Sequence, residues 1–114
     1  MLMSIDTQII PVTSIDMLEQ LFARSHDAPV LLFNCDMSCP RCIPAYQLMT
    51  RIGGDVALID VICAKRVALA LAERTGIRHE SPQVVLLRDG RAVWSAAHYA
   101  ITYGAVRHAL HEYA

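Results

Sequence analysis

A Cys-x-x-Cys pair, Cys39-Pro40-Arg41-Cys42, stands between an apolar run and a segment with helical character. The apolar run at residues 30–33 is continuous, as expected of a strand that is buried on both faces of a sheet. Residues 43–52 then follow the pair with a helix-like pattern. Two thiols at such a strand-to-helix junction are placed for reversible disulfide chemistry. The pair therefore predicts a sheet edge at which a strand ends and a helix begins.

The helix N-terminus supplies the physical reason for this interpretation. Its unpaired backbone N–H groups and the positive end of the helix dipole stabilise negative charge. We expect them to stabilise a thiolate on Cys39, with the charge of Arg41 adding to the effect. Cys42 is expected one turn further into the helix. Cys39 is thus the candidate nucleophile, and Cys42 is the candidate second catalytic thiol.

Length and composition limit what can surround this pair. The 114 residues are 54% hydrophobic and 18% charged, which predicts a single domain over residues 1–114 with its own core. A net charge of −1 and scattered basic residues argue against a nucleic-acid partner. No signal-peptide pattern and no span of about 18 apolar residues is present, so we expect a cytoplasmic protein without a membrane partner. In a reducing compartment, the CxxC is better explained by catalysis or metal binding than by a structural disulfide.

Strand and helix patterns alternate along the chain. The order is βαβαβα followed by ββα, which predicts an α/β fold with a central mixed sheet flanked by helices. The expected elements are a strand at 9–12, a helix capped by Thr13 or Ser14, a strand at 30–33, a helix at 43–52 ended by Gly53-Gly54, a strand at 57–62, a helix at 67–75 capped by Gly76, a hairpin of 84–87 and 92–95 around Asp89-Gly90, and a helix at 102–113.

This order, with a CxxC at the head of the second helix, resembles the thioredoxin fold. Proteins of that fold carry a cis-proline before the strand that starts the terminal hairpin, next to the active-site cysteines. Ser81-Pro82 occupies that position here. The resemblance implies a cis Ser81–Pro82 bond, and it implies that both residues belong to the substrate groove.

The second half of the chain carries a narrower resemblance. It resembles the monothiol bacilliredoxins, also called bacillithiol-system redox-active proteins, through the run Gly-Ile-Arg-His-Glu-Ser-Pro-Gln at 76–83, Gly90, Ala-Val-Trp at 92–94, His98 and Ile101-Thr102. The family implies an oxidoreductase that removes bacillithiol, a low-molecular-weight thiol, from mixed disulfides on cytosolic proteins. It implies bacillithiol or a similar thiol as co-substrate and no other cofactor. Cys39 and Pro40 match the nucleophile and its proline, and the resemblance implies that Pro40 and Arg41 belong to the substrate-binding residues.

Cys42 departs from this family, because monothiol members usually have serine there. The pair then resembles the Cys-Pro-x-Cys of glutaredoxins, and a general dithiol reductase of thioredoxin or glutaredoxin type remains an alternative. His79 is expected at the edge of the substrate groove, where it would contact a carboxylate or assist proton transfer. An equally simple interpretation is that His79 is a surface histidine without a role. Arg41, with Arg78 and Lys65, is expected to attract the malate carboxylates of bacillithiol.

A second class of function is a zinc or iron–sulfur protein that uses Cys35, Cys39, Cys42 and Cys63. The first three follow a CxxxCxxC spacing, and thiolates select both kinds of centre. The plainer interpretation is that Cys35 and Cys63 are small apolar side chains. We therefore expect no metal, and a thiol–disulfide oxidoreductase is the favoured function.

Overall fold

The computed structural model describes residues 6–114. Residues 1–5 lie outside the described part, and the expectation of no signal peptide depends partly on them. The elements are β1 (Thr7–Pro11), α1 (Ile15–Arg24), β2 (Val30–Cys35), α2 (Cys42–Met49), β3 (Gly54–Asp60), α3 (Lys65–Thr75), β4 (Gln83–Arg88), β5 (Arg91–Ala97), the 3-10 turn η1 (His98–Ala100) and α4 (Tyr103–Glu112). The expected order is therefore confirmed, with one added turn.

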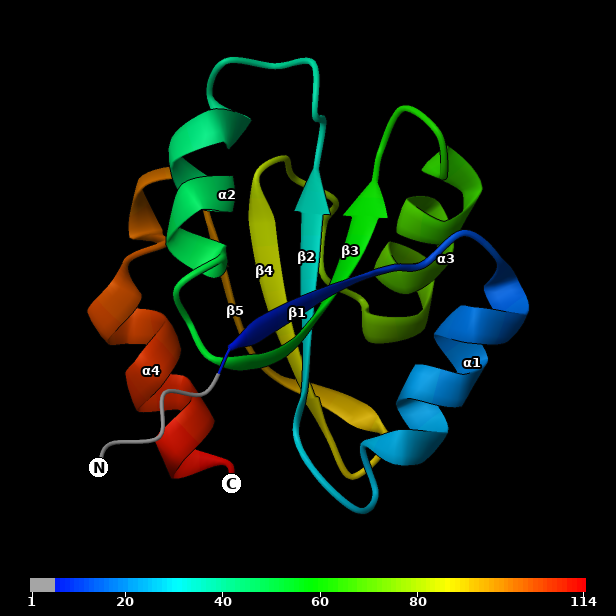
Figure 1. Ribbon diagram of the computed structural model, residues 1–114. Helices are drawn as coiled ribbons and strands as arrows, with labels where there is room; N and C mark the ends of the chain where they lie inside the picture. Colours follow the sequence, from blue (N-terminus) through cyan, green and yellow to red (C-terminus); the bar gives the residue numbers. More distant parts are fainter. Residues whose placement is uncertain (1–5) are drawn as a thin grey trace.

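The five strands form one mixed sheet in the order β1-β3-β2-β4-β5 (Figure 1). β1 and β2 both run parallel to β3, whereas β4 runs antiparallel to β2 and β5 antiparallel to β4. In Figure 1, α1 and α3 lie on one side of the sheet and α2 and α4 on the other. This arrangement confirms the α/β fold with a central mixed sheet flanked by helices.

β2 is buried along its whole length and separates two hydrophobic clusters. Successive side chains of a strand point to opposite faces of its sheet. Val30 and Leu32 accordingly join the cluster formed with α1 and α3. Leu31, Phe33 and Cys35 join the cluster formed with α2 and α4. The alternation thus turns Cys35 toward the helix that begins with Cys42.

Turns and caps follow from local sequence. The Ser14 hydroxyl accepts the Met17 N–H and begins α1, and Gly76 ends α3 in the left-handed conformation at φ +73°. In the hairpin turn, Asp89 and Gly90 both have positive φ, as an Asp-Gly turn requires. A Cβ on Gly90 would lie 2.9 Å from the ring of His26, so only glycine fits there without movement.

The structure shifts several expected boundaries, most clearly those of β3 and α2, and adds η1. β3 begins at Gly54 and not at residue 57, because Gly54 pairs with Thr7 of β1. The Gly53 N–H also bonds to the Thr7 hydroxyl at 2.8 Å. α2 ends at Met49, three residues before the expected end, and η1 was not expected. Among residues 6–114, no helix has the length and apolar character needed to cross a membrane.

Candidate active site

The CxxC lies in a turn that leaves the end of β2 at the upper edge of the sheet in Figure 1. The Asp36 carboxylate accepts the Ser38 N–H at 2.9 Å and the Ser38 hydroxyl at 2.6 Å. The Cys39 N–H bonds to the Asp36 carbonyl, and the Cys42 N–H bonds to the Cys39 carbonyl, each at 2.9 Å. Asp36 therefore shapes the turn. The Asp-x-Ser sequence, typical of an Asx turn, was the available signal that our reading of the chain missed.

The two cysteines of the pair differ in exposure. Cys39 is partly buried, whereas only 2% of Cys42 is exposed. Cys42 is the first residue of α2 and not a residue one turn inside it, because the turn from Cys39 to Cys42 precedes the helix. Solvent and a large substrate therefore reach Cys39 more readily than Cys42.

Ser81 connects the turn to the loop before β4. The Ser81 hydroxyl oxygen accepts the Asp36 N–H at 3.0 Å and lies 3.5 Å from the Cys42 sulfur. The Ser81–Pro82 peptide bond is cis, as the resemblance implied. The side chain of Ser81, expected to bind substrate, thus contacts the second thiol of the pair.

Gln83 holds the same loop against β2. Its amide oxygen accepts the Asn34 side-chain N–H at 2.8 Å, and its amide nitrogen donates to the Arg78 carbonyl at 2.9 Å. Asn34 and Gln83 are both buried and face each other in the β2–β4 register. This buried pair fixes where the loop with Ser81 meets the CxxC turn. Our sequence analysis did not single out either amide as a site residue.

Cys35 and Cys63 have different surroundings. Cys35 is fully buried, and its sulfur lies 3.8 Å from the Cys42 carbonyl oxygen. Burial first, and then the neighbouring Cys42 side chain, raise the pKa of the Cys35 thiol. Cys63 is exposed, and the neighbouring Asp60 carboxylate raises the pKa of its thiol. All four cysteines are free. Within the described part of the chain, no three metal-ligating side chains form a group suited to an ion.

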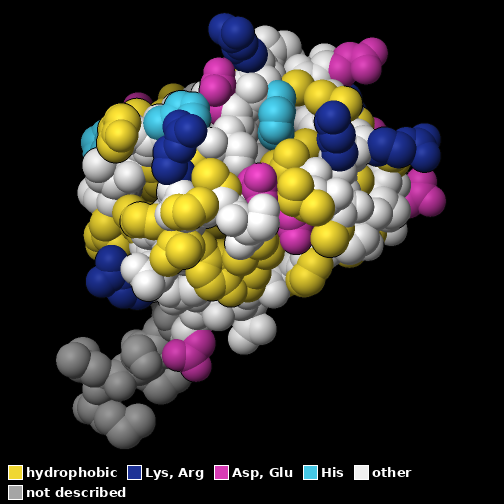
Figure 2. All heavy atoms as spheres, turned by 90° about the horizontal axis from the view of Figure 1, so that it is seen from above, with side chains coloured by type: hydrophobic (Ala, Val, Ile, Leu, Met, Phe, Trp, Pro, Cys, Tyr) yellow, Lys and Arg dark blue, Asp and Glu magenta, His cyan; other side chains and the backbone are white. Residues whose placement is uncertain are grey.

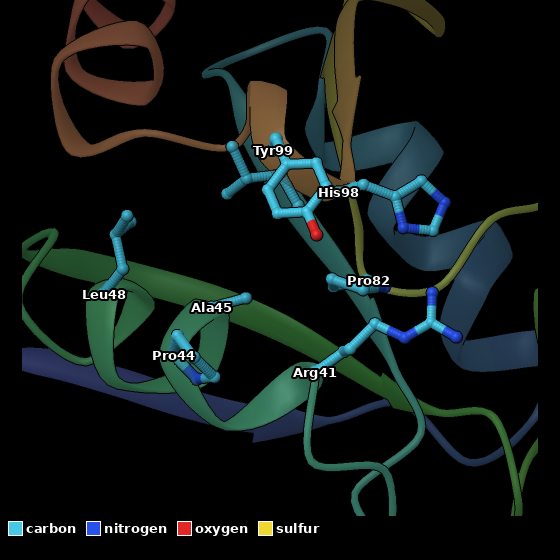
Figure 3. Close-up of a pocket in the computed structure, with 8 residues that line it drawn as sticks. Arg41, Pro44, Ala45, Leu48, Pro82, His98 and Tyr99 are labelled. Carbon is cyan, nitrogen blue, oxygen red and sulfur yellow. The ribbon is translucent and has the colours of Figure 1, made fainter.

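A groove of about 570 Å³ opens beside the pair (Figure 3). It runs between the first turns of α2 and the segment that contains η1. Its lining residues are Arg41, Pro44, Ala45, Leu48, Pro82, His98, Tyr99 and Ile101. Of the residues expected to bind substrate, Arg41 and Pro82 line this groove. Pro40 and His79 are not among the lining residues.

The η1 wall of the groove is tied to the loop before β4. The His98 N–H bonds to the Pro82 carbonyl at 3.0 Å, and the His98 ring nitrogen Nε2 lies 3.0 Å from a Glu80 carboxylate oxygen. The hydrogen bond with His98 lowers the pKa of Glu80. These contacts hold Tyr99, whose side chain is 97% exposed, at the rim of the groove. His79 instead has a buried Nδ1 atom without a hydrogen-bond partner in residues 6–114.

The face seen in Figure 2 looks down on the sheet edge of Figure 1. Hydrophobic side chains run across it, and the Lys and Arg side chains are spread around it singly. A nucleic-acid surface would require clustered positive charge.

Solved structures share this architecture. A structure described as "a putative oxidoreductase with a thioredoxin fold" is 27% identical, with a TM-score of 0.77 over 89% of this chain and 92% of its own. A thioredoxin mutant from Halobacterium salinarum is 22% identical, with a TM-score of 0.74 over 93% of this chain and 90% of its own. A thioredoxin from Malassezia sympodialis is 16% identical, with a TM-score of 0.75 over 99% and 96%. The fold is therefore that of thioredoxin.

The family model described as Monothiol bacilliredoxin BrxC matches residues 10–106. This match spans the CxxC turn, the cis-proline loop and η1. It agrees with the resemblance carried by the run at 76–83 and by His98. The chain is a thiol–disulfide oxidoreductase, and it belongs to the monothiol bacilliredoxin family.

Proposed function

We propose that this protein removes bacillithiol, or a similar low-molecular-weight thiol, from mixed disulfides on cytosolic proteins. The observation that carries the proposal is a partly exposed Cys39 next to a buried Cys42, with Arg41 between them lining a groove with mainly apolar walls. A mixed disulfide joins a bulky protein to a small polar thiol. A single accessible sulfur close to an apolar groove suits such a substrate.

The first step is a thiol–disulfide exchange at Cys39. The Cys39 thiolate attacks the bacillithiol sulfur, a new S–S bond forms, and the substrate protein leaves as a thiolate that takes up a proton. One disulfide and one thiol are exchanged for another disulfide and another thiol, so the step requires no external oxidant or reductant. The product is Cys39 linked to bacillithiol.

The second step frees Cys39 by one of two routes. The Cys42 thiolate attacks the Cys39 sulfur, forms the Cys39–Cys42 disulfide and releases bacillithiol. Alternatively, a second low-molecular-weight thiol attacks the bacillithiol sulfur and restores the Cys39 thiol. The 3.5 Å contact between the Ser81 hydroxyl and Cys42 supports the first route, because a hydroxyl stabilises a thiolate by donating a hydrogen bond.

The two halves of the substrate have different requirements. An apolar side chain of the substrate protein fits between Leu48 and Tyr99 in the groove. The malate carboxylates of bacillithiol suit the guanidinium of Arg41, which lies two residues after the nucleophile. Arg78 is less suited to binding these carboxylates, because its Nε already lies 3.9 Å from the Glu80 carboxylate.

A general dithiol reductase is the alternative function. The observation in its favour is the presence of Cys42, which lets an intramolecular disulfide close the cycle without a small thiol. Such an enzyme would reduce protein disulfides at a rate independent of bacillithiol. The two functions therefore predict different products. A bacilliredoxin acquires a bacillithiol adduct on Cys39, whereas a dithiol reductase reduces a protein disulfide without one.

The test exposes the reduced protein to oxidised bacillithiol and, separately, to oxidised glutathione, and then measures intact mass. Cys42→Ser traps the adduct, Cys39→Ser is the matched control, and both variants carry Cys63→Ser so that the exposed thiol forms no adduct. We expect a bacillithiol adduct on Cys39 in the first variant and none in the second, with glutathione adducts forming more slowly. Equal adducts from both disulfides would remove the preference for bacillithiol. Rapid reduction of a protein disulfide without any adduct would favour the dithiol reductase.

A further inference from the structure

Cys35 is a buried thiol that takes part in neither of the two steps above. It ends β2 on the face turned toward α2, in the same hydrophobic cluster as Cys42. None of Cys35 and only 2% of Cys42 is exposed. The Cys35 thiol donates a hydrogen bond to the Cys42 carbonyl oxygen at 3.8 Å. The Cys35 sulfur therefore touches the backbone of Cys42, and both thiols are shielded from water.

Cys42 thus has a thiol neighbour on each side. Cys39 precedes it by three residues through the turn at the protein surface, and Cys35 meets it from the strand below. A disulfide that includes Cys42 has two possible partners, one partly exposed and one fully buried. Exchange between these partners needs no molecule from solution.

We propose that Cys35 is a third redox thiol that takes the disulfide over from Cys39. The Cys35 sulfur attacks the Cys42 sulfur of the Cys39–Cys42 disulfide, the Cys35–Cys42 bond forms, and the Cys39–Cys42 bond breaks. Cys39 leaves as a thiolate, and the proton of Cys35 passes to solvent or to Cys39. No electrons enter or leave the protein. The inference rests on the proposed function only for the origin of the first disulfide.

The exchange converts a dithiol site into a monothiol site. Once Cys42 is joined to Cys35, it no longer resolves an adduct on Cys39. Cys39 is again free to attack a mixed disulfide, and a second small thiol must then release it. The buried disulfide is out of reach of a folded reductant, so it persists until a small thiol enters. This chain would therefore keep the monothiol chemistry of its family when oxidised, despite having Cys42.

The exchange is slow at neutral pH. Burial raises the pKa of Cys35, and the groups that face it, namely Cys42, Asp36 and Asp60, add to the effect. Because the thiolate is the attacking form, its small fraction limits the rate. Below the pKa of Cys35, the rate should rise about tenfold for each pH unit. Cys42 therefore resolves Cys39 first, and Cys35 follows.

The test oxidises Cys39→Ser with diamide, a diazene that accepts two electrons and two protons from a pair of thiols. The variant also carries Cys63→Ser, which removes the exposed thiol and with it disulfides between molecules. Free thiols are alkylated after unfolding, and peptides are mapped by mass spectrometry. We expect a Cys35–Cys42 crosslink in most molecules. The control adds Cys35→Ala, with its fold checked by circular dichroism, and should leave Cys42 alkylated.

A second measurement uses Cys63→Ser alone, oxidised in the same way and sampled over time. We expect a Cys39–Cys42 crosslink first, and then its replacement by Cys35–Cys42 with Cys39 free, faster at higher pH. Alkylation of both Cys35 and Cys42 in the oxidised Cys39→Ser variant would overturn the inference. A Cys39–Cys42 crosslink that never converts to Cys35–Cys42 would overturn it as well. Diamide replaces bacillithiol here. Failure to remove bacillithiol from proteins would consequently leave these outcomes unaffected.

Discussion

The hydroxyl oxygen of Ser81 lies 3.5 Å from the sulfur of Cys42 and accepts the backbone N–H of Asp36 at 3.0 Å. The Asp36 N–H uses only one lone pair of the Ser81 oxygen, so the hydroxyl proton stays available to the Cys42 sulfur. One side chain thereby joins the CxxC turn, the second thiol and the loop before β4. The contact links the stability of the turn to the reactivity of Cys42.

Ser81→Ala should weaken both properties. We expect the free energy of unfolding to fall by about 1 kcal/mol, because the Asp36 N–H loses its acceptor. We also expect the Cys39–Cys42 disulfide to form more slowly after adduct formation, while attack by Cys39 keeps its rate. Urea denaturation and stopped-flow measurement of the two steps check this. A change confined to the first step would contradict the contact with Cys42.

Cys39→Ser should abolish removal of bacillithiol from a protein, whereas Cys42→Ser should retain substantial activity when a small thiol is present. The first attack requires one thiolate only, and an external thiol can replace Cys42 in the second step. Release of bacillithiol from a thiolated protein, followed by mass spectrometry, measures both variants. If both were inactive, Cys42 would be obligatory.

Limited alkylation at neutral pH should modify Cys39 before Cys42. Cys39 is partly exposed and Cys42 is only 2% exposed, so the reagent meets Cys39 first. Cys63→Ser serves as the background, since Cys63 is exposed as well. Peptide mapping at low reagent gives the order. Faster modification of Cys42 would reverse the roles assigned to the two thiols.

Asp60→Asn should speed alkylation of Cys63. The Asp60 carboxylate is the main cause of the raised pKa of Cys63, and removal of its charge increases the thiolate fraction at neutral pH. Asp55→Asn, an exposed substitution at the start of the same strand, is the matched control. The rate constant with iodoacetamide should rise in the first variant only. Equal rates in both would show that the Asp60 charge does not act on Cys63.

The Glu80–His98 hydrogen bond should make stability depend on pH. The pKa of Glu80 is lowered in the folded protein, so its contribution is present above the unfolded value, about 4.3, and is lost as pH falls through the folded value. Wild type should therefore melt at a higher temperature than Glu80→Gln at about pH 6, and this difference should vanish at about pH 2. A difference that stays constant across this range would rule out the ionised carboxylate as its source.

Tyr99→Ala should raise KM for a thiolated protein and leave a small mixed disulfide unaffected. Tyr99 lines the groove with 97% of its side chain exposed, so its removal costs contact with a large substrate but little folding energy. We expect about a fivefold rise in KM, equivalent to roughly 1 kcal/mol. Tyr103→Ala on α4 is the control. Equal effects on both substrates would argue against the groove as the protein-binding site.

Local patterns were sufficient for most of the fold and for the reactive turn. The CxxC at a strand end, the Ser14 cap, the Asp89-Gly90 turn and the left-handed Gly76 each depend on residues close in sequence. Such features are governed by short-range hydrogen bonds and backbone sterics, which a sequence displays directly. The family pattern similarly indicated Ser81-Pro82, whose bond is cis.

Tertiary structure decided which distant residues meet. Gly54 joins β3 because it pairs with Thr7, some 47 positions away in the chain, and η1 becomes a groove wall through contacts with Pro82 and Glu80. By itself, the sequence indicated a buried strand at residues 30–33 and a CxxC pair where that strand gives way to a helix. Only packing of α2 on the sheet brought Cys35 against Cys42, because the face that a strand presents to a helix is selected by burial across the whole sheet.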